Sequence, residues 1–435
     1  MTPPIAGFSK LSKNEKIHWL STTYFSNPDQ AKEILSQYWN TDTKLQQLHD
    51  EFIENTVSNY YLPLGVAPNF LVNNELYTIP MAVEESSVVA AASKAAKYWH
   101  QRGGFKTEII GTVKIGHVHF MYDGDPDLLE TFFNTHKDSF LEAVSSITAN
   151  MRRRGGGVTA IKLENKTAAL PNYYQLHCEF ETLDAMGANF INSCLEQFAQ
   201  TLSSLFEKDH QFTGANLTVI MSILSNYVPN CVVKASVSCP VDELGEKEIK
   251  GEEFAQKFVQ AIQIAKAEPY RAVTHNKGVM NGIDAVVIAT GNDFRAVEAA
   301  VHAYAGRNGS YTSLTHASIE DGVFTYWIEI PLALGTVGGL TKLHPLAQWS
   351  LELMQRPNAK KLMELTAVAG LAQNFAALRS LVTTGIQKGH MKMHLMNILN
   401  QLEVTSEEKE YAIAHFTTNT VSHSAVVNFV DALRS

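Results

Sequence analysis

The sequence predicts a soluble α+β protein with at least two domains, and three observations support this fold class. The chain has 435 residues, more than the roughly 250–300 residues at which a single hydrophobic core stops growing. Hydrophobic residues make up 45% of the chain and charged residues 18%, so it has material for a core and no compositional sign of disorder. Strand-like and helical runs alternate through the middle of the chain, which is typical of a mixed fold.

Charge and cysteine content exclude several classes of protein. Lys and Arg number 35 against 44 Asp and Glu, a formal net charge of −9, and the one short basic run is Arg152, Arg153 and Arg154. A nucleic-acid partner is therefore not expected. The four cysteines form no C-x-x-C pair, which favours a reducing compartment over a zinc site. With no apolar signal at the N-terminus and no run of about 18 apolar residues, we expect a cytoplasmic protein without a membrane partner.

The first hundred residues are expected to hold a helical arm, a hairpin and a short helix. Residues 1–50 are polar with sparse apolar positions, which indicates helices. The stretch Tyr60–Pro68 is extended and punctuated by proline, and a hairpin is expected to turn at Val72–Glu75. An alanine-rich helix follows over Ser87–Tyr98, where small side chains permit the close approach of another backbone.

Residues 108–226 are predicted to form a separate α+β subdomain inserted into a larger domain, because strands and helices alternate there. The basic run and Gly155–Gly157 lie between its first long helix and the next strand. The expected strands are Ile109–Val113, His117–Met121, Tyr173–Phe180 and Asn216–Ile220, and the expected helices are Pro126–Ile147 and Met186–Phe206.

The larger domain would comprise residues 1–107 and 227–384. A composition break at Gly385–Gly389 precedes a small helical segment, and such a segment behind glycines is a candidate for a mobile lid over 385–435. The elements expected before the lid are a helix over Glu253–Lys266, a strand over Asp284–Ala289, a helix over Asp293–Ala305, a strand over Gly322–Leu332 and a glycine-rich loop over Gly335–Gly339.

The first candidate site is the pair Glu84 and Glu85, which follows an apolar strand and precedes the alanine-rich helix. Adjacent side chains point in different directions, so at most one of the two is expected to serve a cleft. The alternative is an ordinary helix start, where carboxylates favour the helix dipole and Ser86 or Ser87 supplies a cap.

Two further candidates lie close together. The segment Glu268–Asp284 carries Arg, Thr, His, Asn and Lys side chains on an expected loop, and these supply donors for an anionic ligand and a cation for an oxyanion. The alternative is a solvated connection rich in turns. Thr290–Asp293 follows the expected strand, where ligands of α/β sheets gather, although Asn292 or Asp293 also suits a helix N-cap.

Weaker signals come from glycine-rich segments. Gly335–Gly339 has the composition of a phosphate-binding turn, but the spacing of a G-x-G-x-x-G fingerprint is absent from the chain. A nicotinamide cofactor would therefore bind outside a Rossmann fold. Asp184–Asn189 offers a helix N-terminus for an anionic group, with a capped helix start as the alternative.

His390 and His394 are four residues apart and would share one helix face. A third ligand and a neighbouring Glu are missing, so a metal site is not expected. His390 follows a glycine and is the better candidate for a titrating acid, while His394 suits a surface or core position.

Taken together, these segments resemble the 3-hydroxy-3-methylglutaryl-coenzyme A (HMG-CoA) reductase family, in particular its soluble class II form of bacteria and archaea. The resemblance spans almost the whole chain, because the motifs occur in the family's order between about residues 50 and 395. The motifs are Glu84–Ser87, Asp184–Asn189, Glu268–Asp284, Thr290–Asp293, Gly335–Gly339 and Gly389–Met391.

The resemblance implies roles for individual residues. The implied catalytic residues are Glu85, Lys277, Asp293 and His390, and the implied substrate contacts are Ser87, Arg271, Thr274 and Asn281. The implied cofactor contacts are Asp184, Met186, Gly187, Asn189 and Asn226, with Arg152, Arg153 and Arg154 beside them, and no metal is implied.

The chemistry that the resemblance implies is reduction of the HMG-CoA thioester by two hydrides, through mevaldehyde, to mevalonate and coenzyme A. This is a step of isoprenoid synthesis or, in reverse, of mevalonate degradation. Lys277 would stabilise the carbonyl oxygen, Glu85 would donate a proton to it, and Asp293 beside both would keep Lys277 charged. His390, on a closing lid, would protonate the departing thiolate.

Four departures from the family pattern affect these expectations. The stretch Glu54–Ser58 lacks the glycine with which the family's stretch ends. Ser86 stands where proline is common, and Leu340 stands where a small residue is usual. Ala160 replaces an Asp that in some members suits the cofactor ribose. Without that carboxylate, and with Arg152–Arg154 adjacent, a 2′-phosphate would be tolerated. NADPH is therefore the predicted cofactor, with NADH as the alternative.

The fold that the resemblance implies is a large mixed substrate domain, an inserted ferredoxin-like cofactor subdomain that is not a Rossmann fold, and a helical C-terminal lid. The expected assembly is a homodimer with shared active sites, or a larger oligomer. Two other functions remain open: a different NAD(P)-dependent acyl-CoA oxidoreductase on the same scaffold, and an inactive acyl-CoA-binding protein.

Overall fold

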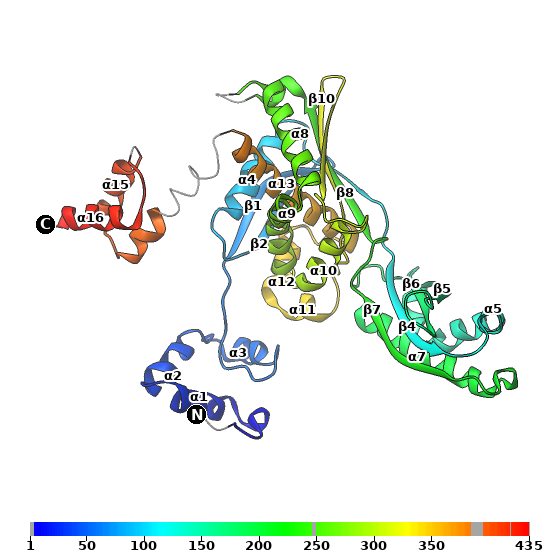
Figure 1. Ribbon diagram of the computed structural model, residues 1–435. Helices are drawn as coiled ribbons and strands as arrows, with labels where there is room; N and C mark the ends of the chain where they lie inside the picture. Colours follow the sequence, from blue (N-terminus) through cyan, green and yellow to red (C-terminus); the bar gives the residue numbers. More distant parts are fainter. Residues whose placement is uncertain (1–3, 246–248, 384–394, 418, 435) are drawn as a thin grey trace. The chain divides into compact units, whose positions relative to one another are not determined.

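The computed structural model describes residues 4–245, 249–383, 395–417 and 419–434, and the chain divides into two compact units, residues 1–63 and 64–435. The first unit is helical, as predicted, and Ser12 opens its first α-helix with a capping box to Glu15. Its elements are the 3-10 helix η1 (Phe8–Lys10) and helices α1 (Lys13–Tyr24), α2 (Pro28–Gln37) and α3 (Thr43–Asp50) (Figure 1).

The second unit begins with the predicted hairpin. Strands β1 (Leu64–Val72) and β2 (Glu75–Ala82) pair antiparallel, with a bulge between Ala67 and Phe70. Asn73 and Asn74 form the two-residue turn with φ of 49° and 71°, which asparagine tolerates better than most residues. Helix α4 (Val88–His100) follows and packs on β1, as its small side chains allow.

A second sheet contains four antiparallel strands in the order β3-β8-β10-β9. The 3-10 helix η3 (Val241–Leu244) and helix α8 (Gly251–Ala267) follow β8. The predicted strand Ile109–Val113 is misplaced by a few residues, because β3 ends at Ile109. The strands are β3 (Lys106–Ile109), β8 (Val232–Pro240), β9 (Thr315–Glu320) and β10 (Val323–Pro331).

Helices α9 (Pro269–Ala289) and α13 (Ala359–Val382) pack at the centre of this part of the molecule (Figure 1). The predicted strand Asp284–Ala289 is wrong, because this apolar run is the last third of α9. Buried helices and buried strands are both apolar on all sides, so a run of six residues does not distinguish them. The remaining helices are α10 (Phe294–Ala305), α11 (Gly339–Leu343) and α12 (Pro345–Leu353).

Helix α13 is, among the described residues, long and apolar enough to cross a membrane by length and composition. However, 67% of that stretch is buried inside the protein. Core helices of soluble proteins have the same property, and α13 contributes side chains such as Leu365, Val368 and Phe375 to the largest hydrophobic core.

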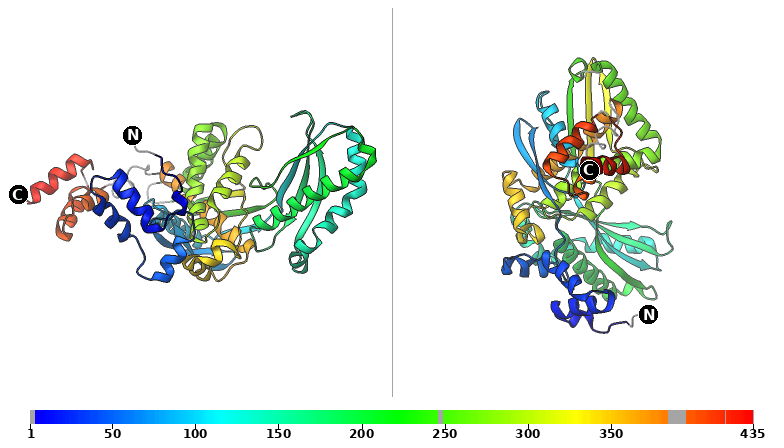
Figure 2. Two further views of the ribbon diagram at one scale, coloured as in Figure 1. Left: turned by 90° about the horizontal axis from the view of Figure 1, so that it is seen from below. Right: turned by 90° about the vertical axis from the view of Figure 1, so that its left-hand side faces the viewer.

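The segment between β3 and β8 forms a third sheet with strand order β5-β6-β4-β7, antiparallel throughout. The order of elements is β-α-β-β-α-β, so the ferredoxin-like prediction is confirmed. Its helices lie against one face of the sheet (Figure 2), over a hydrophobic core of its own. The elements are β4 (Lys114–Tyr122), α5 (Pro126–Ala143), α6 (Ser145–Arg153), β5 (Gly157–Asn165), β6 (Tyr173–Glu181), α7 (Ala188–Lys208), η2 (His210–Phe212) and β7 (Leu217–Ser225).

The C-terminal segment is helical where it is described. Residues 395–401, α15 (Ser406–His415) and α16 (His423–Arg434) share a small hydrophobic cluster of their own. Gly385–Gly389, His390 and His394 lie outside the described residues. The domain boundaries and the lid stay predictions.

Candidate active site

Glu85 and Lys277 form an ion pair, with Lys277 Nζ donating to Glu85 Oε2 at 2.8 Å. Asn281 Nδ2 donates to the same oxygen at 3.4 Å. Glu85 lies between β2 and α4, and Ser87 occupies the N-cap of α4 with φ of 77°. The side chains of Lys277 and Glu85 are 61% and 40% exposed, so a ligand can reach both. Glu85, not Glu84, is therefore the residue of the pair that meets the predicted lysine.

Helix α9 explains why these side chains gather. The sequence indicated a loop over Glu268–Asp284, which is wrong, because Glu268 caps a continuous helix that begins at Pro269. Arg271, Thr274, Lys277 and Asn281 are spaced by three, three and four residues, so they share one face. Burial lowers the pKa of Arg271 from its ordinary value, although a guanidinium stays charged.

The opposite face of α9 rests on buried hydrogen bonds. His275 Nε2 and Thr315 Oγ1 are 2.6 Å apart, and Asn374 Nδ2 donates to the His275 carbonyl at 3.0 Å. Tyr326 Oη in turn donates to Asn374 Oδ1 at 2.6 Å. Burial lowers the pKa of His275 to about 3, so this imidazole is neutral and has a structural role. The network fixes the rotation of α9 and hence the direction of Lys277.

A second buried cluster, which sequence reasoning did not single out, joins α9 to α10. Asp284 donates a shared proton to Glu298, because burial and the neighbouring carboxylate raise the pKa of Asp284 to about 8. The bond from His302 holds the pKa of Glu298 below its ordinary value; His302 Nε2 lies 2.6 Å from Glu298 Oε2. His302 Nδ1 also lies 2.7 Å from the Tyr311 hydroxyl. Four polar side chains from α9, α10 and the segment after α10 thus hold one another.

Asp293 is the N-cap of α10, the commoner of the two roles that its sequence position suggested. Its Oδ1 accepts from the backbone N–H of Arg295 at 3.0 Å and of Ala296 at 3.2 Å, and from Arg295 Nε at 3.2 Å. In the described part of the chain, no hydrogen bond or ion pair joins Asp293 to Lys277 or Glu85. The contact with both that the resemblance implied is therefore absent from this conformation.

Asn292 connects the turn before α10 to the glycine-rich loop. Its Oδ1 accepts from Gly335 N at 2.8 Å and its Nδ2 donates to Gly335 O at 3.0 Å. A Cβ on Gly335 would lie 2.6 Å from Met186 N, so only glycine permits this close approach. The loop also donates from Thr336 N to Asp184 O at 2.8 Å. The α10 turn is thereby tied to the Asp184–Asn189 segment.

The residues predicted to bind the cofactor gather at one end of the ferredoxin-like sheet. Because the sheet is antiparallel, the starts of β4 and β5 and the ends of β6 and β7 share that end. Gly157 pairs with Glu181 there, which brings Arg152–Arg154 next to the segment that leads into α7. These arginines are exposed. Asp184 differs from the others, because its Oδ1 accepts from Ala359 N at 2.9 Å and so holds the start of α13.

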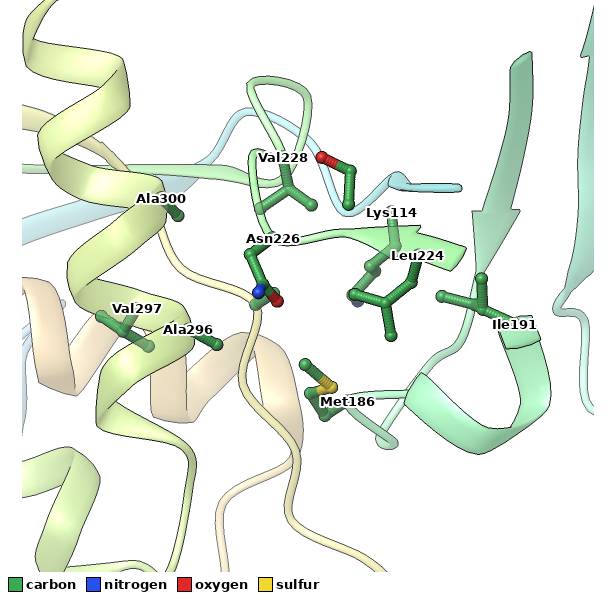
Figure 3. Close-up of a pocket in the computed structure, with 11 residues that line it drawn as sticks. Lys114, Met186, Ile191, Leu224, Asn226, Val228, Ala296, Val297 and Ala300 are labelled. Carbon is green, nitrogen blue, oxygen red and sulfur yellow. The ribbon is translucent and has the colours of Figure 1, made fainter. Parts of the chain in front are cut away.

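A small pocket lies at the same end (Figure 3). Lys114 and Asn226 point into it above Met186, and the side chains of Ile191, Leu224 and α10 form apolar walls. Lys114 is 4% exposed and was not singled out from the sequence. A dinucleotide carries both flat apolar rings and phosphates, and the apolar walls, the Lys114 cation and the adjoining helix N-terminus offer contacts for parts of such a ligand.

Other chemistries lack support in the described residues. No group of three or more His, Cys, Asp or Glu side chains there is arranged to hold a metal ion. Burial raises the pKa of Cys194 to about 12 and that of Cys239 to about 11, and it also raises the pKa of Cys178 and Cys231. These thiols are therefore protonated near neutral pH and are poor nucleophiles.

An exposed Glu–Lys pair, together with a cation and a free helix N-terminus on a sheet that is not a Rossmann fold, fits the class of NAD(P)H-dependent oxidoreductases. The chain belongs to the hydroxymethylglutaryl-coenzyme A reductase family, whose sequence model matches residues 13–395.

Two curated relatives support the assignment. The chain is 36% identical over 413 residues to 3-hydroxy-3-methylglutaryl-coenzyme A reductase of Archaeoglobus fulgidus, covering 95% of this chain and 90% of the relative. It is 31% identical over 403 residues to a probable reductase of Borreliella burgdorferi, covering 92% and 89%.

Solved structures support the class II form. The class II enzyme of Streptococcus pneumoniae bound to NADPH in open conformations matches with a TM-score of 0.72 and 34% identity, over 88% of this chain and 100% of that one. Another structure of the Streptococcus pneumoniae enzyme matches with a TM-score of 0.73 and 33% identity, over 99% and 100%. The predicted family, its class and its dependence on a reduced nicotinamide cofactor are confirmed.

Proposed function

We propose that the chain reduces HMG-CoA to mevalonate and coenzyme A at the site formed by Glu85, Lys277 and Asn281, with NADPH as the reductant. The observation that carries the proposal is the 2.8 Å ion pair between Lys277 and Glu85, presented on the polar face of α9. The balanced reaction consumes two reduced nicotinamides and two protons for each thioester. When bound, the reduced nicotinamide supplies the hydride for each of the two reductions.

Lys277 stabilises the negative charge that develops on the carbonyl oxygen in each reduction. Glu85 lies within hydrogen-bond reach of the Lys277 ammonium and acts as the proton donor to that oxygen. Asn281 holds the Glu85 carboxyl from the next turn of α9. The N-cap of α10 uses only Oδ1 of Asp293, so Oδ2 is available to accept from Lys277, and we propose that substrate binding brings the two side chains together.

The same helix face supplies the substrate contacts. Arg271 stands six residues before Lys277 on α9 and pairs with the free carboxylate of the acyl group, since a guanidinium suits bidentate carboxylate recognition. Thr274 and Ser87 supply hydroxyls on either side of the ion pair. The selectivity for a thioester that also carries a carboxylate follows from this arrangement.

Cofactor binding is assigned to the end of the ferredoxin-like sheet, through Met186, Gly187, Asn189 and Asn226. Arg152–Arg154 favour the 2′-phosphate of NADPH, and Ala160 offers no carboxylate to repel it. The NADPH-bound relative from Streptococcus pneumoniae supports this preference. His390, outside the described residues, stays the predicted proton donor to the coenzyme A thiolate. A cytoplasmic homodimer with shared active sites also stays a prediction.

The test is oxidation of NADPH and NADH at matched concentrations by the purified protein with HMG-CoA, with Glu85→Gln as the matched control. We expect oxidation that depends on HMG-CoA, faster with NADPH, and a loss of about 100-fold or more in Glu85→Gln. Equal rates for the wild type and Glu85→Gln would contradict the proposal.

A panel of acyl-CoA thioesters separates the two other functions. A different acyl-CoA oxidoreductase would prefer a thioester without a free carboxylate. An inactive binding protein would bind HMG-CoA without oxidising either cofactor, and Lys277→Ala would then leave ligand binding unchanged.

A further inference from the structure

Lys114 is a buried lysine for which the described residues supply no partner. It opens β4, pairs in register with Phe180, and is 4% exposed. Among the described residues, no hydrogen bond or ion pair is formed by its ammonium. A buried ammonium without a counter-ion is strongly unfavourable, so a position of this kind is expected to meet an anion that the protein binds.

Glu181, the residue after the register partner of Lys114 on β6, forms no ion pair with Lys114 among the described residues. Its Oε1 accepts from Leu183 N at 2.8 Å, and its Oε2 accepts from the Thr112 hydroxyl. The charge of Lys114 is felt instead by the buried thiol of Cys231. The side chain of Lys114 points into the pocket (Figure 3).

A second feature beside the pocket also favours an anion. Helix α7 has 21 residues and begins after Gly187, and no side chain caps its first turn. Its free N–H groups and the dipole of a long helix attract negative charge. Ile191, in that first turn, and Met186, just before it, both line the pocket with Lys114. Two independent sources of positive potential thus converge on one place.

We infer that Lys114 is a further cofactor-binding residue, whose ammonium pairs with an oxygen of the dinucleotide's pyrophosphate beside the uncapped start of α7. The inference rests on the proposed function, because it concerns the cofactor of the same reaction. The 2′-phosphate is assigned elsewhere: Arg152–Arg154 precede β5, two strands from β4 in the sheet order β5-β6-β4. That separation is about 10 Å, so the two positive sites suit two separate phosphate groups.

The test compares Lys114→Met, which keeps the length of the side chain and removes its charge, with Lys162→Met as the matched control. Lys162 lies on β5 of the same sheet and pairs with Glu179 at the surface. Dissociation constants of NADPH, NADH and HMG-CoA are measured by calorimetric titration at several salt concentrations.

We expect Lys114→Met to bind NADPH and NADH about 10- to 100-fold more weakly, both to the same degree, with a smaller salt dependence. HMG-CoA affinity should not change, and Lys162→Met should behave as the wild type. Without cofactor, Lys114→Met should unfold at the same or a higher temperature, because a buried unpaired charge is removed. A lysine with only a structural role would lower that temperature and leave cofactor affinity unchanged.

Three results would overturn the inference: unchanged affinity for both cofactors, a loss confined to NADPH, or a loss confined to HMG-CoA. If Lys114→Met does not fold, Lys114→Gln repeats the titration with a polar group in the pocket. A wild-type protein that binds both cofactors but reduces no HMG-CoA would contradict the proposed function. The cofactor titration of Lys114→Met would still test the role of Lys114, because it does not depend on activity.

Discussion

Two lysines in the second unit have opposite surroundings. Lys277 lies on the exposed face of α9 and already has a partner, Glu85, at 2.8 Å. Lys114 is buried at the start of β4 and has none among the described residues. A cation that must reach a reacting oxygen needs access and a group that positions it, whereas a cation that binds a fixed anion can stand in a closed pocket. This difference in surroundings indicates that Lys277 serves the chemical step and Lys114 serves cofactor binding.

The largest expected effect comes from Lys277→Ala. Removing the cation that stabilises the developing oxyanion should lower kcat by about 10²–10³ or more. The dissociation constant of NADPH should stay within about twofold of the wild type, since Lys114 and the start of α7 are untouched. Steady-state kinetics and a cofactor titration check both numbers. If Lys277→Ala lowered NADPH affinity as much as it lowered kcat, the two lysines would not have the separate roles described here.

The next effect concerns the packing that supports Lys277. A Cβ on Gly282 would lie 2.4 Å from Ala369 O of α13, so Gly282→Ala must push α9 away from α13. We expect a loss of about 1–3 kcal/mol in the free energy of unfolding.

Gly278→Ala is the matched control for that variant, on the same helix. Its Cβ would meet Asn374 Nδ2 at 3.6 Å, an ordinary contact. It should change stability little or raise it by about 0.5–1 kcal/mol, because alanine favours a helix more than glycine does. Denaturant unfolding measures both variants, and equal effects would show that the close approach of α9 to α13 does not matter.

A smaller effect is a pH dependence of stability from Asp284. Its pKa is raised to about 8, against about 3.9 in the unfolded chain, so between these values the folded state holds a proton that the unfolded state has lost. The free energy of unfolding should therefore fall as pH rises through that window, by at most about 1.4 kcal/mol per pH unit. The lowered pKa of Glu298 acts in the opposite sense, but only below about pH 4.5.

Asp284→Asn should reduce this slope between pH 5 and 8 and gain stability relative to the wild type at pH 8. Unfolding curves at a series of pH values test it, and parallel curves for the two proteins would show that the proton is not held by Asp284. Because Asp284 lies two turns beyond Lys277 on α9, the experiment also tests how firmly that helix is tied to α10.

Much of the fold could be predicted from the sequence, and the failures have physical causes. The ferredoxin-like segment was predictable, because its strands and helices have distinct periodicities, as in His117–Met121 and Met186–Phe206. Helix α9 was missed because Arg271, His275 and Asn276 resemble a polar loop, although the last two are buried in specific hydrogen bonds. Their hydrogen-bond partners, Thr315 and Thr312, are distant in the sequence, so no local pattern predicts that these polar residues can be buried in a helix.

The candidate site was predicted in part. The family resemblance implied that Glu85 and Lys277 share one site, and the structure places them at hydrogen-bond distance. Asp293 was left between two roles and occupies the helix cap. Lys114 was not predicted, because one lysine at a strand start looks like any exposed lysine until the strand order shows that it is buried.

The most direct test of the account is the stoichiometry of the complete reaction. NADPH oxidised and coenzyme A thiol released are measured together in one reaction with limiting HMG-CoA. The account predicts two NADPH oxidised for each thiol released, with mevalonate as the product. One NADPH per thiol, with an aldehyde accumulating, or NADPH oxidation without thiol release, would contradict it.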